Sequence, residues 1–211
     1  NKKMTLIIAH RGFSGKYLDN SYESLMMALE MNVDMIELDI RLCQSGELVV
    51  FHDWRVGEDL IHKCSLNYLK RKYQLMSLED VLQIYHLYSQ NYSKSQLLLD
   101  IKTPHYEVNH IPEQCSKLID ILHEYISDGV INYHNFVCSS FNKDILKQLY
   151  YHDKQIRLGF ITSYISDDLD TIPTEFPIYS ISLYYNELTK IKKDKLKEKN
   201  IKLFLYTVNS S

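Results

Sequence analysis

The sequence predicts an α/β fold, a (β/α)8 barrel of parallel strands and outer helices, with the eighth βα unit missing from this chain. Short runs rich in Ile, Val, Leu and Phe alternate with segments of helical period along its 211 residues, which is the pattern of a parallel sheet. Ionisable residues follow several of these runs, as they do at one rim of such a barrel. Because no repeat or Gly/Ser linker divides the chain, we expect one barrel domain over residues 1–211.

The apolar runs define the expected strands. Gln44-Ser45-Gly46 predicts a turn that joins Asp34–Ile40 to a hairpin extension at Glu47–Phe51. The other expected strands are Thr5–Ala9, Gln96–Ile101, Asn135–Ser139, Ile156–Ile161, Ile178–Leu183 and Ile201–Thr207. With the hairpin counted as part of the second strand there are seven core strands in the prediction, whereas a closed parallel barrel has eight. Either an eighth unit is absent from this chain or the sheet is open, and we favour the first explanation.

Helices are predicted between these strands. Asn20 is expected to cap a helix at Ser21–Glu30, and Ser77 with Asp80 resembles a capping box. The stretch from Trp54 to Met76 is expected to be a short insertion after the second strand. The remaining predicted helices are Ile111–Ile126, Lys143–Tyr151 and Asn186–Lys199.

Composition and charge exclude some classes of protein. The formal net charge of -3 argues against a nucleic-acid binder, and Lys190–Lys199, which Asp194 and Glu198 interrupt, is typical of a solvated helix face. No apolar run has the length of a membrane span, and the N-terminus lacks a signal sequence, so we expect a cytoplasmic protein. Four cysteines without CxxC spacing are expected to be free thiols in a reducing compartment: Cys43, Cys64, Cys115 and Cys138.

Carboxylates stand in pairs with other charged residues in two of the predicted strands. Glu37 and Asp39 are two residues apart, as are Asp100 and Lys102, so each pair shares one face of its strand. The interior and the helix-facing side of a barrel are apolar along most of their height, and unpaired carboxylates are costly there. Carboxylates side by side become reasonable at the C-terminal rim, where a cation between them would offset their charge.

Histidines follow two other runs at the same predicted rim. His10 and Arg11 come directly after the first strand, and His52-Asp53 follows the hairpin strand. Each feature also has a simpler interpretation, such as a structural histidine, a charged edge strand or a rim ion pair. All of these interpretations would have to hold at once in successive strands, so we interpret the cluster as a functional site. Asp53 could orient a histidine or brace its loop.

Four segments together resemble the glycerophosphodiester phosphodiesterase family. The signature of this family is HRG, then ENT, then E-x-D, then G-x-x-V-x-x-HD. The corresponding segments are Ile8–Gly12, Asp19–Ser21, Asp34–Ile40 and Gly46–Asp53. Weaker matches follow in the same order, so that the resemblance covers essentially the whole chain: Leu78–Leu82, Leu98–Lys102, Ser139–Phe141 and Tyr206–Asn209.

The resemblance implies a barrel enzyme that hydrolyses small glycerophosphodiesters to glycerol 3-phosphate and an alcohol. It also implies a divalent cation, Ca²⁺ or Mg²⁺, for which oxygen ligands are suited. By position, it implies metal ligands at Glu37, Asp39 and Asp100, an acid/base pair at His10 and His52, and phosphate contacts at Arg11 and Lys102. The nucleophile is left open between water and a glycerol hydroxyl. Two alternatives are a lipid-directed phospholipase D-type enzyme on the same barrel and a barrel that binds a phosphorylated ligand without turnover.

The sequence departs from the family pattern at three positions. Asp100 stands where the family usually has Glu, Asp19 replaces the Glu of ENT, and Tyr206 replaces a Trp. The shorter side chain of Asp100 predicts a shifted, water-bridged or weaker metal contact, and Asp19 is a second shortening, at a position near the substrate. His105 is a weaker candidate for a position near the rim. Three aromatic residues are expected either to line a substrate pocket or to pack elsewhere: Tyr17, Tyr22 and Trp54.

Overall fold

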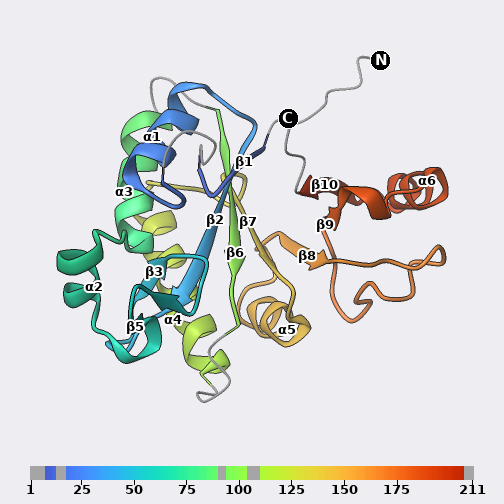
Figure 1. Ribbon diagram of the computed structural model, residues 1–211. Helices are drawn as coiled ribbons and strands as arrows, with labels where there is room; N and C mark the ends of the chain where they lie inside the picture. Colours follow the sequence, from blue (N-terminus) through green and yellow to red (C-terminus); the bar gives the residue numbers. More distant parts are fainter. Residues whose placement is uncertain (1–7, 13–17, 90–93, 104–109, 207–211) are drawn as a thin grey trace.

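The computed structural model describes residues 8–12, 18–89, 94–103 and 110–206. Within these ranges the backbone forms a parallel sheet that is nearly closed into a barrel and carries helices on its outer side (Figure 1). The parallel strands among the described residues are, in spatial order, β1 (Ile8–His10), β2 (Met35–Leu42), β6 (Gln96–Ile101), β7 (Phe136–Ser140), β8 (Leu158–Thr162), β9 (Ser180–Tyr184) and β10 (Lys202–Tyr206).

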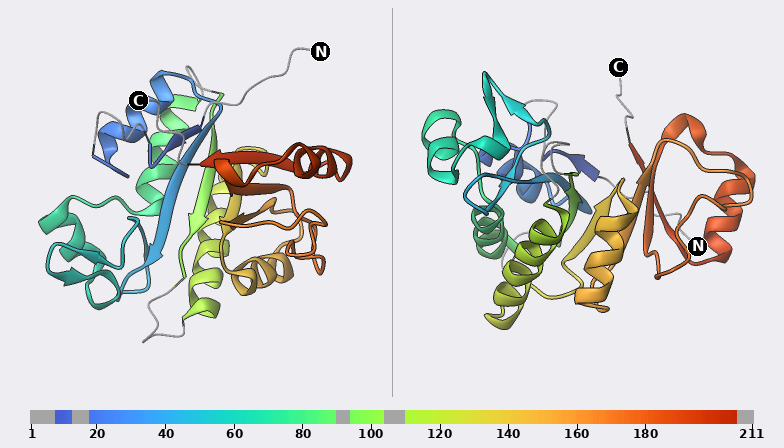
Figure 2. Two further views of the ribbon diagram at one scale, coloured as in Figure 1. Left: turned by 45° about the vertical axis from the view of Figure 1, so that its right-hand side comes forward. Right: turned by 90° about the horizontal axis from the view of Figure 1, so that it is seen from below.

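The strand order confirms the predicted fold class. Each strand pairs in parallel with the next one along the list, from β1 at one end to β10 at the other. Seven parallel strands, counted over the described residues, fit a barrel that lacks one unit. The two further views show the strands wound around a common axis, with the segment from β8 to β10 facing β1 and β2 across it (Figure 2). Strands β7, β8 and β9 begin one or two residues later than predicted.

The hairpin extension of the second strand is also confirmed. β3 (Leu48–Val50) pairs antiparallel with the end of β2, and Gly46 in the turn has a φ of 85°, which glycine adopts without strain. The insertion that follows contains a two-stranded hairpin and a helix: β4 (Arg55–Val56), β5 (Asp59–Leu60), the 3-10 turn Ile61–Lys63 and α2 (Leu66–Tyr73).

Most helices lie where they were predicted. They are α1 (Tyr22–Glu30), α3 (Leu78–Ser89), α4 (Ile111–Ser127), α5 (Lys143–His152) and α6 (Lys190–Glu198). The capping box is confirmed, because the backbone and side chain of Ser77 bond reciprocally with Asp80.

The structure corrects two of the helix predictions. The cap of α1 is Ser21 rather than Asn20, whose φ of 55° lies in the left-handed region. α6 begins at Lys190 rather than at Asn186, because a 3-10 turn occupies Tyr185–Glu187 and Thr189 then caps the helix.

Alternation along the strands separates two buried layers. Ile36, Leu38 and Ile40 of β2 pack outward against the helices. The opposite face of the same strand points into the barrel, where Met35 joins a second apolar cluster. The other members of that cluster are Leu98, Val137 and Phe204. This cluster forms an apolar floor, above which the inward positions become polar.

All four cysteines are free thiols, and Cys64 is the one that is half-buried rather than buried. Within the described part of the chain, no helix has the length and apolar character that a membrane crossing requires.

Candidate functional site

Three carboxylates from two adjacent strands meet above the apolar floor. Glu37 and Asp39 come from β2, and Asp100 comes from β6, where it is the registered partner of Asp39. Each residue is at most 7% exposed. One oxygen from each side chain lies within 4.8 Å of the other two, which is close enough for all three to bind one ion. The structure therefore brings together the three predicted metal ligands.

The electrostatics of this triad indicate a missing positive charge. Burial, followed by the charges of Asp39 and Asp100, raises the pKa of Glu37 well above its usual range. Burial also raises the pKa of Asp100 to about 6, despite Lys102. Burial alone would raise the pKa of Asp39, but Lys102, a hydrogen bond from Asn20 and other cations lower it. Positive charge bound among the carboxylates would favour the ionised form of all three.

Two oxygens of the triad lack a hydrogen bond. Oδ1 of Asp39 and Oδ1 of Asp100 are buried and accept no hydrogen bond from any described residue. Buried carboxylate oxygens without a hydrogen bond are costly, and a hard cation is the ligand that an all-oxygen donor set fits. The buried triad thus suggests a divalent metal.

Asn20 holds Asp39 in place and was not predicted to belong to the site. Its side-chain amide donates to Oδ2 of Asp39 at 3.0 Å and accepts from the backbone N–H of Asp39 at 3.2 Å. The left-handed backbone of Asn20 turns its side chain into the barrel, and asparagine is one of the few residues that tolerate this conformation. The polar residue before the helix was the visible signal, and we interpreted it as a cap.

The two predicted phosphate-binding cations border the triad. Nζ of Lys102 lies 2.7 Å from Asp100 and 3.3 Å from Asp39. Arg11 reaches Asp39 at 3.4 Å through Nε and Asp19 at 2.9 Å through Nη1. The contacts with Asp39 are charge contacts without hydrogen-bond geometry, because Nε of Arg11 and Oδ1 of Asp39 have no hydrogen-bond partner among the described residues. Both cations can therefore face an anion beside the triad.

His10 stands at the edge of the same cluster. Its Nε2 lies 3.5 Å from Glu37, while 56% of its side chain is exposed. Burial of the ring, followed by the charge of Arg11, lowers the pKa of His10 below its usual value of 6.5. The imidazole is therefore mostly neutral at neutral pH and able to accept a proton.

His52 reaches the cluster from the end of β3. Asp53 accepts a hydrogen bond from its Nδ1 at 2.6 Å, which supports the first of the two roles predicted for Asp53, the orientation of this ring. With Nδ1 protonated, Nε2 is the nitrogen left for chemistry. The charge of His52 also acts on Asp39 and on His10, which places the imidazole within electrostatic reach of the triad and of the other histidine.

Arg41 is a second residue that sequence reasoning missed. Its guanidinium donates twice to the backbone carbonyl of His52, at 2.8 and 2.6 Å, and once to that of Thr103, at 3.3 Å. It thus joins the loop after β3 to the end of β6. The available signal was its spacing, since Arg41 lies two residues beyond Asp39 on the same face of β2.

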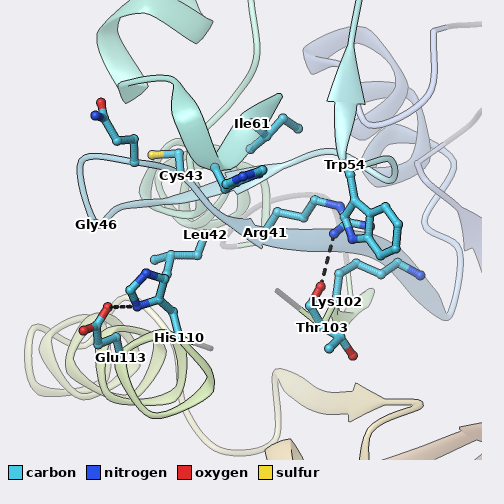
Figure 3. Close-up of a pocket in the computed structure, with 12 residues that line it drawn as sticks. Arg41, Leu42, Cys43, Gly46, Trp54, Ile61, Lys102, Thr103, His110 and Glu113 are labelled. Carbon is cyan, nitrogen blue, oxygen red and sulfur yellow. Dashed lines mark hydrogen bonds and ion pairs between the residues drawn. The ribbon is translucent and has the colours of Figure 1, made fainter. Parts of the chain in front are cut away.

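A cavity of about 180 Å³ lies on the Arg41 side of the site (Figure 3). Trp54, which was predicted either to line a substrate pocket or to pack elsewhere, lines this cavity. Tyr22 is half exposed at the start of α1 and does not line it. Tyr17 and His105 lie outside the described residues. Lys102 also lines the cavity and so connects it to the triad. The lining also includes Thr103, His110 and Glu113.

Comparison with known proteins agrees with this geometry. Residues 10–211 match the model of the glycerophosphoryl diester phosphodiesterase family. A glycerophosphodiester phosphodiesterase of Caldanaerobacter subterraneus subsp. tengcongensis is 26% identical over 97% of this chain and 86% of its own length. An uncharacterized protein of Mycoplasma genitalium is 29% identical, with 97% and 87% covered.

Solved structures show the same fold. A phosphodiesterase from Oleispira antarctica, in complex with the product sn-glycerol-3-phosphate, superposes with a TM-score of 0.80 at 22% identity over 98% of this chain and 86% of that one. A glycerophosphodiester phosphodiesterase from Thermotoga maritima gives a TM-score of 0.72 at 24% identity, with 98% and 88% covered. The family match over nearly the whole sequence, together with the triad at the rim of the barrel, places this chain in the glycerophosphoryl diester phosphodiesterase family.

Proposed function

We propose that this protein hydrolyses glycerophosphodiesters to glycerol 3-phosphate and an alcohol, with a divalent cation at Glu37, Asp39 and Asp100. The observation that carries the proposal is the convergence of these carboxylates with two cations and an imidazole on one centre. The names of the relatives support the reaction, as does the product found in the Oleispira antarctica phosphodiesterase.

Calcium and magnesium are the cations that fit best, because the triad offers only oxygen ligands. When bound, such a cation would neutralise the phosphodiester and make phosphorus more open to attack. Asp100 is shorter than the Glu usual in the family, but its carboxylate reaches within the same 4.8 Å as the other two. The shortening therefore leaves a complete donor set.

Arg11 and Lys102 would hold the phosphate next to the triad. The planar guanidinium of Arg11 can donate two parallel hydrogen bonds to phosphate oxygens, and Lys102 supplies a compact charge. Before substrate binds, ion pairs with Asp19 and Asp100 keep these two side chains extended toward the centre. Their removal would weaken the binding of the charged group without removing the proton-transfer residues.

The two histidines would move the protons. The hydroxyl that attacks phosphorus, from water or from the glycerol itself, must lose a proton, and the departing alkoxide must gain one. The hydrogen bond from Nδ1 of His52 to Asp53 leaves Nε2 for proton transfer, and we assign His52 as the acid. His10, whose lowered pKa favours the neutral ring, then acts as the base.

The test is release of glycerol 3-phosphate, measured with a coupled assay on several diesters. EDTA should abolish turnover, and Ca²⁺ or Mg²⁺ should restore it. His52→Ala should lower kcat by about 100-fold or more, the usual range for a lost acid or base. His86→Ala, on the outer helix α3, is the matched control and should keep full activity. Turnover that is insensitive to EDTA would contradict the metal role of the triad.

A further inference from the structure

Lys102, beside which a bound phosphate would sit, also lines the cavity of Figure 3, whereas the three carboxylates of the triad do not. A substituent on that phosphate would enter it. We propose, resting on the proposed function, that this cavity binds the leaving alcohol of the diester and selects an uncharged polyol over a quaternary ammonium alcohol. Its residues select by hydrogen bonding and by charge.

Arg41 provides the hydrogen-bonding wall. A guanidinium has five N–H groups, and among the described residues three of these are directed at the carbonyls of His52 and Thr103. These bonds hold the group rigid beside the cavity, so its remaining N–H groups meet a ligand hydroxyl at little entropic cost. Thr103 lines the same cavity.

A quaternary ammonium lacks donors and acceptors, and it binds instead to open aromatic faces. The indole of Trp54 is the one large aromatic ring that lines the cavity among the described residues, and the guanidinium of Arg41 already lies 5.9 Å from its centre. Lys102 adds a second cation to the lining. The carboxylate of Glu113 is paired with His110 at 2.6 Å. A second positive charge would therefore meet repulsion and an occupied aromatic face.

The size of the cavity agrees with this leaving group. A space of about 180 Å³ holds an alcohol of the size of glycerol.

The test compares glycerol 3-phosphate release from glycerophosphoglycerol and glycerophosphocholine. Glycerophosphoethanol serves as a reference, because its leaving alcohol carries neither a further hydroxyl nor a charge. We expect kcat/KM to be about tenfold higher for glycerophosphoglycerol than for glycerophosphocholine, since paired polar groups discriminate strongly. Thr103→Val should reduce that ratio several-fold, because it removes a hydroxyl but keeps the backbone carbonyl that holds Arg41. Thr174→Val, at another exposed threonine, should leave the ratio unchanged. Equal rates for both diesters, or a ratio unaffected by Thr103→Val, would overturn the proposal.

Glu113→Gln separates recognition of a polyol from recognition of a cation. If the cavity selects a polyol, this change should leave turnover of glycerophosphocholine as it was. If turnover of glycerophosphocholine falls selectively, the carboxylate recognises the ammonium, and the proposal is wrong.

Binding can be followed without turnover, because Trp54 is the one tryptophan in the sequence. In EDTA, its fluorescence reports directly on occupation of the cavity. Glycerophosphoglycerol should change the emission at lower concentration than glycerophosphocholine does. If no diester is hydrolysed at all, the proposed function fails, and this titration still decides the preference of the cavity: equal or reversed affinities overturn it.

Discussion

At the scale of single residues, the site depends on side chains that hold other side chains. Asn20 fixes Asp39, Asp53 fixes His52, and Arg41 fixes the loop that carries His52. Asn20, Asp53 and Arg41 are not among the residues to which we assign the reaction itself. Substitutions at these positions should therefore change the geometry of the site while its reacting groups remain.

Asn20→Ala tests the first of these contacts. The change removes a buried donor and acceptor, and it should lower the free energy of unfolding by about 1–3 kcal/mol. Apparent affinity for Ca²⁺ should fall as well, because Asp39 is no longer held. Urea denaturation and calcium titration measure the two effects, with the exposed Asn186→Ala as control. Wild-type calcium affinity in the variant would argue that Asp39 is held by its strand alone.

Asp53→Asn tests the second. The change replaces the carboxylate that accepts from Nδ1 of His52 with an amide, which orients the ring less firmly, so kcat should fall by about tenfold or more while KM changes little. Steady-state kinetics measure both constants. An unchanged kcat would mean that Asp53 serves only its loop.

At the scale of elements, the insertion after β3 is tied together by one carboxylate. Asp59 of β5 accepts hydrogen bonds from Lys72, Tyr73 and Tyr68, all on α2. These bonds, with that from Lys72 contributing most, lower the pKa of Asp59 to about 2. The insertion borders the cavity through Trp54, so this tie also supports one wall of the site.

A lowered carboxylate pKa contributes stability above the pKa of the unfolded chain and loses it as pH falls toward the folded value. For Asp59 the contribution should be complete above about pH 4 and should disappear between about pH 4 and 2. Asp59→Asn should therefore destabilise the insertion at pH 7 and make no difference near pH 2. Hydrogen exchange of α2 at several pH values measures this, and Asp168→Asn, which removes a largely exposed partner of Lys195, is the control. A constant difference at every pH would contradict the assignment.

At the scale of the whole molecule, a cation at the triad would link neighbouring strands of the sheet. Because the triad joins β2 and β6, cation binding should stabilise the barrel against unfolding. At a cation concentration of 100 Kd the gain is about 2.7 kcal/mol, which corresponds to a rise in Tm of about 5–10 °C for a chain of this size.

Differential scanning calorimetry with EDTA or excess Ca²⁺ measures that rise. Asp100→Asn should abolish it, because one of the three ligands loses its charge. Asp120→Asn, on the exposed side of α4, should retain it in full. If Asp100→Asn is stabilised by calcium as strongly as the wild type, the cation binds elsewhere.

Much of this organisation could be predicted from local sequence. Periodicity placed the strands to within about two residues, and the i, i+2 spacing of Glu37 and Asp39 predicted a shared face, because these patterns depend on backbone geometry that every strand obeys. The motif order then indicated the family and the candidate ligands. Asn20 was wrongly predicted to be a helix cap. Asparagine is favoured both as a cap and as a left-handed residue before a helix, so the residue type alone does not distinguish the two.

Short-range sequence patterns are enough to predict the alternation of strands and helices, the residues at the rim of the barrel and the family to which the chain belongs. Tertiary contacts establish which charges share a centre and which partners hold them. The meeting of Asp39 with Asp100, the clamp of Asn20 and the wall formed by Arg41 and Trp54 join segments far apart along the chain. Such contacts depend on how strands pair and how loops pack, so a local sequence pattern does not predict them.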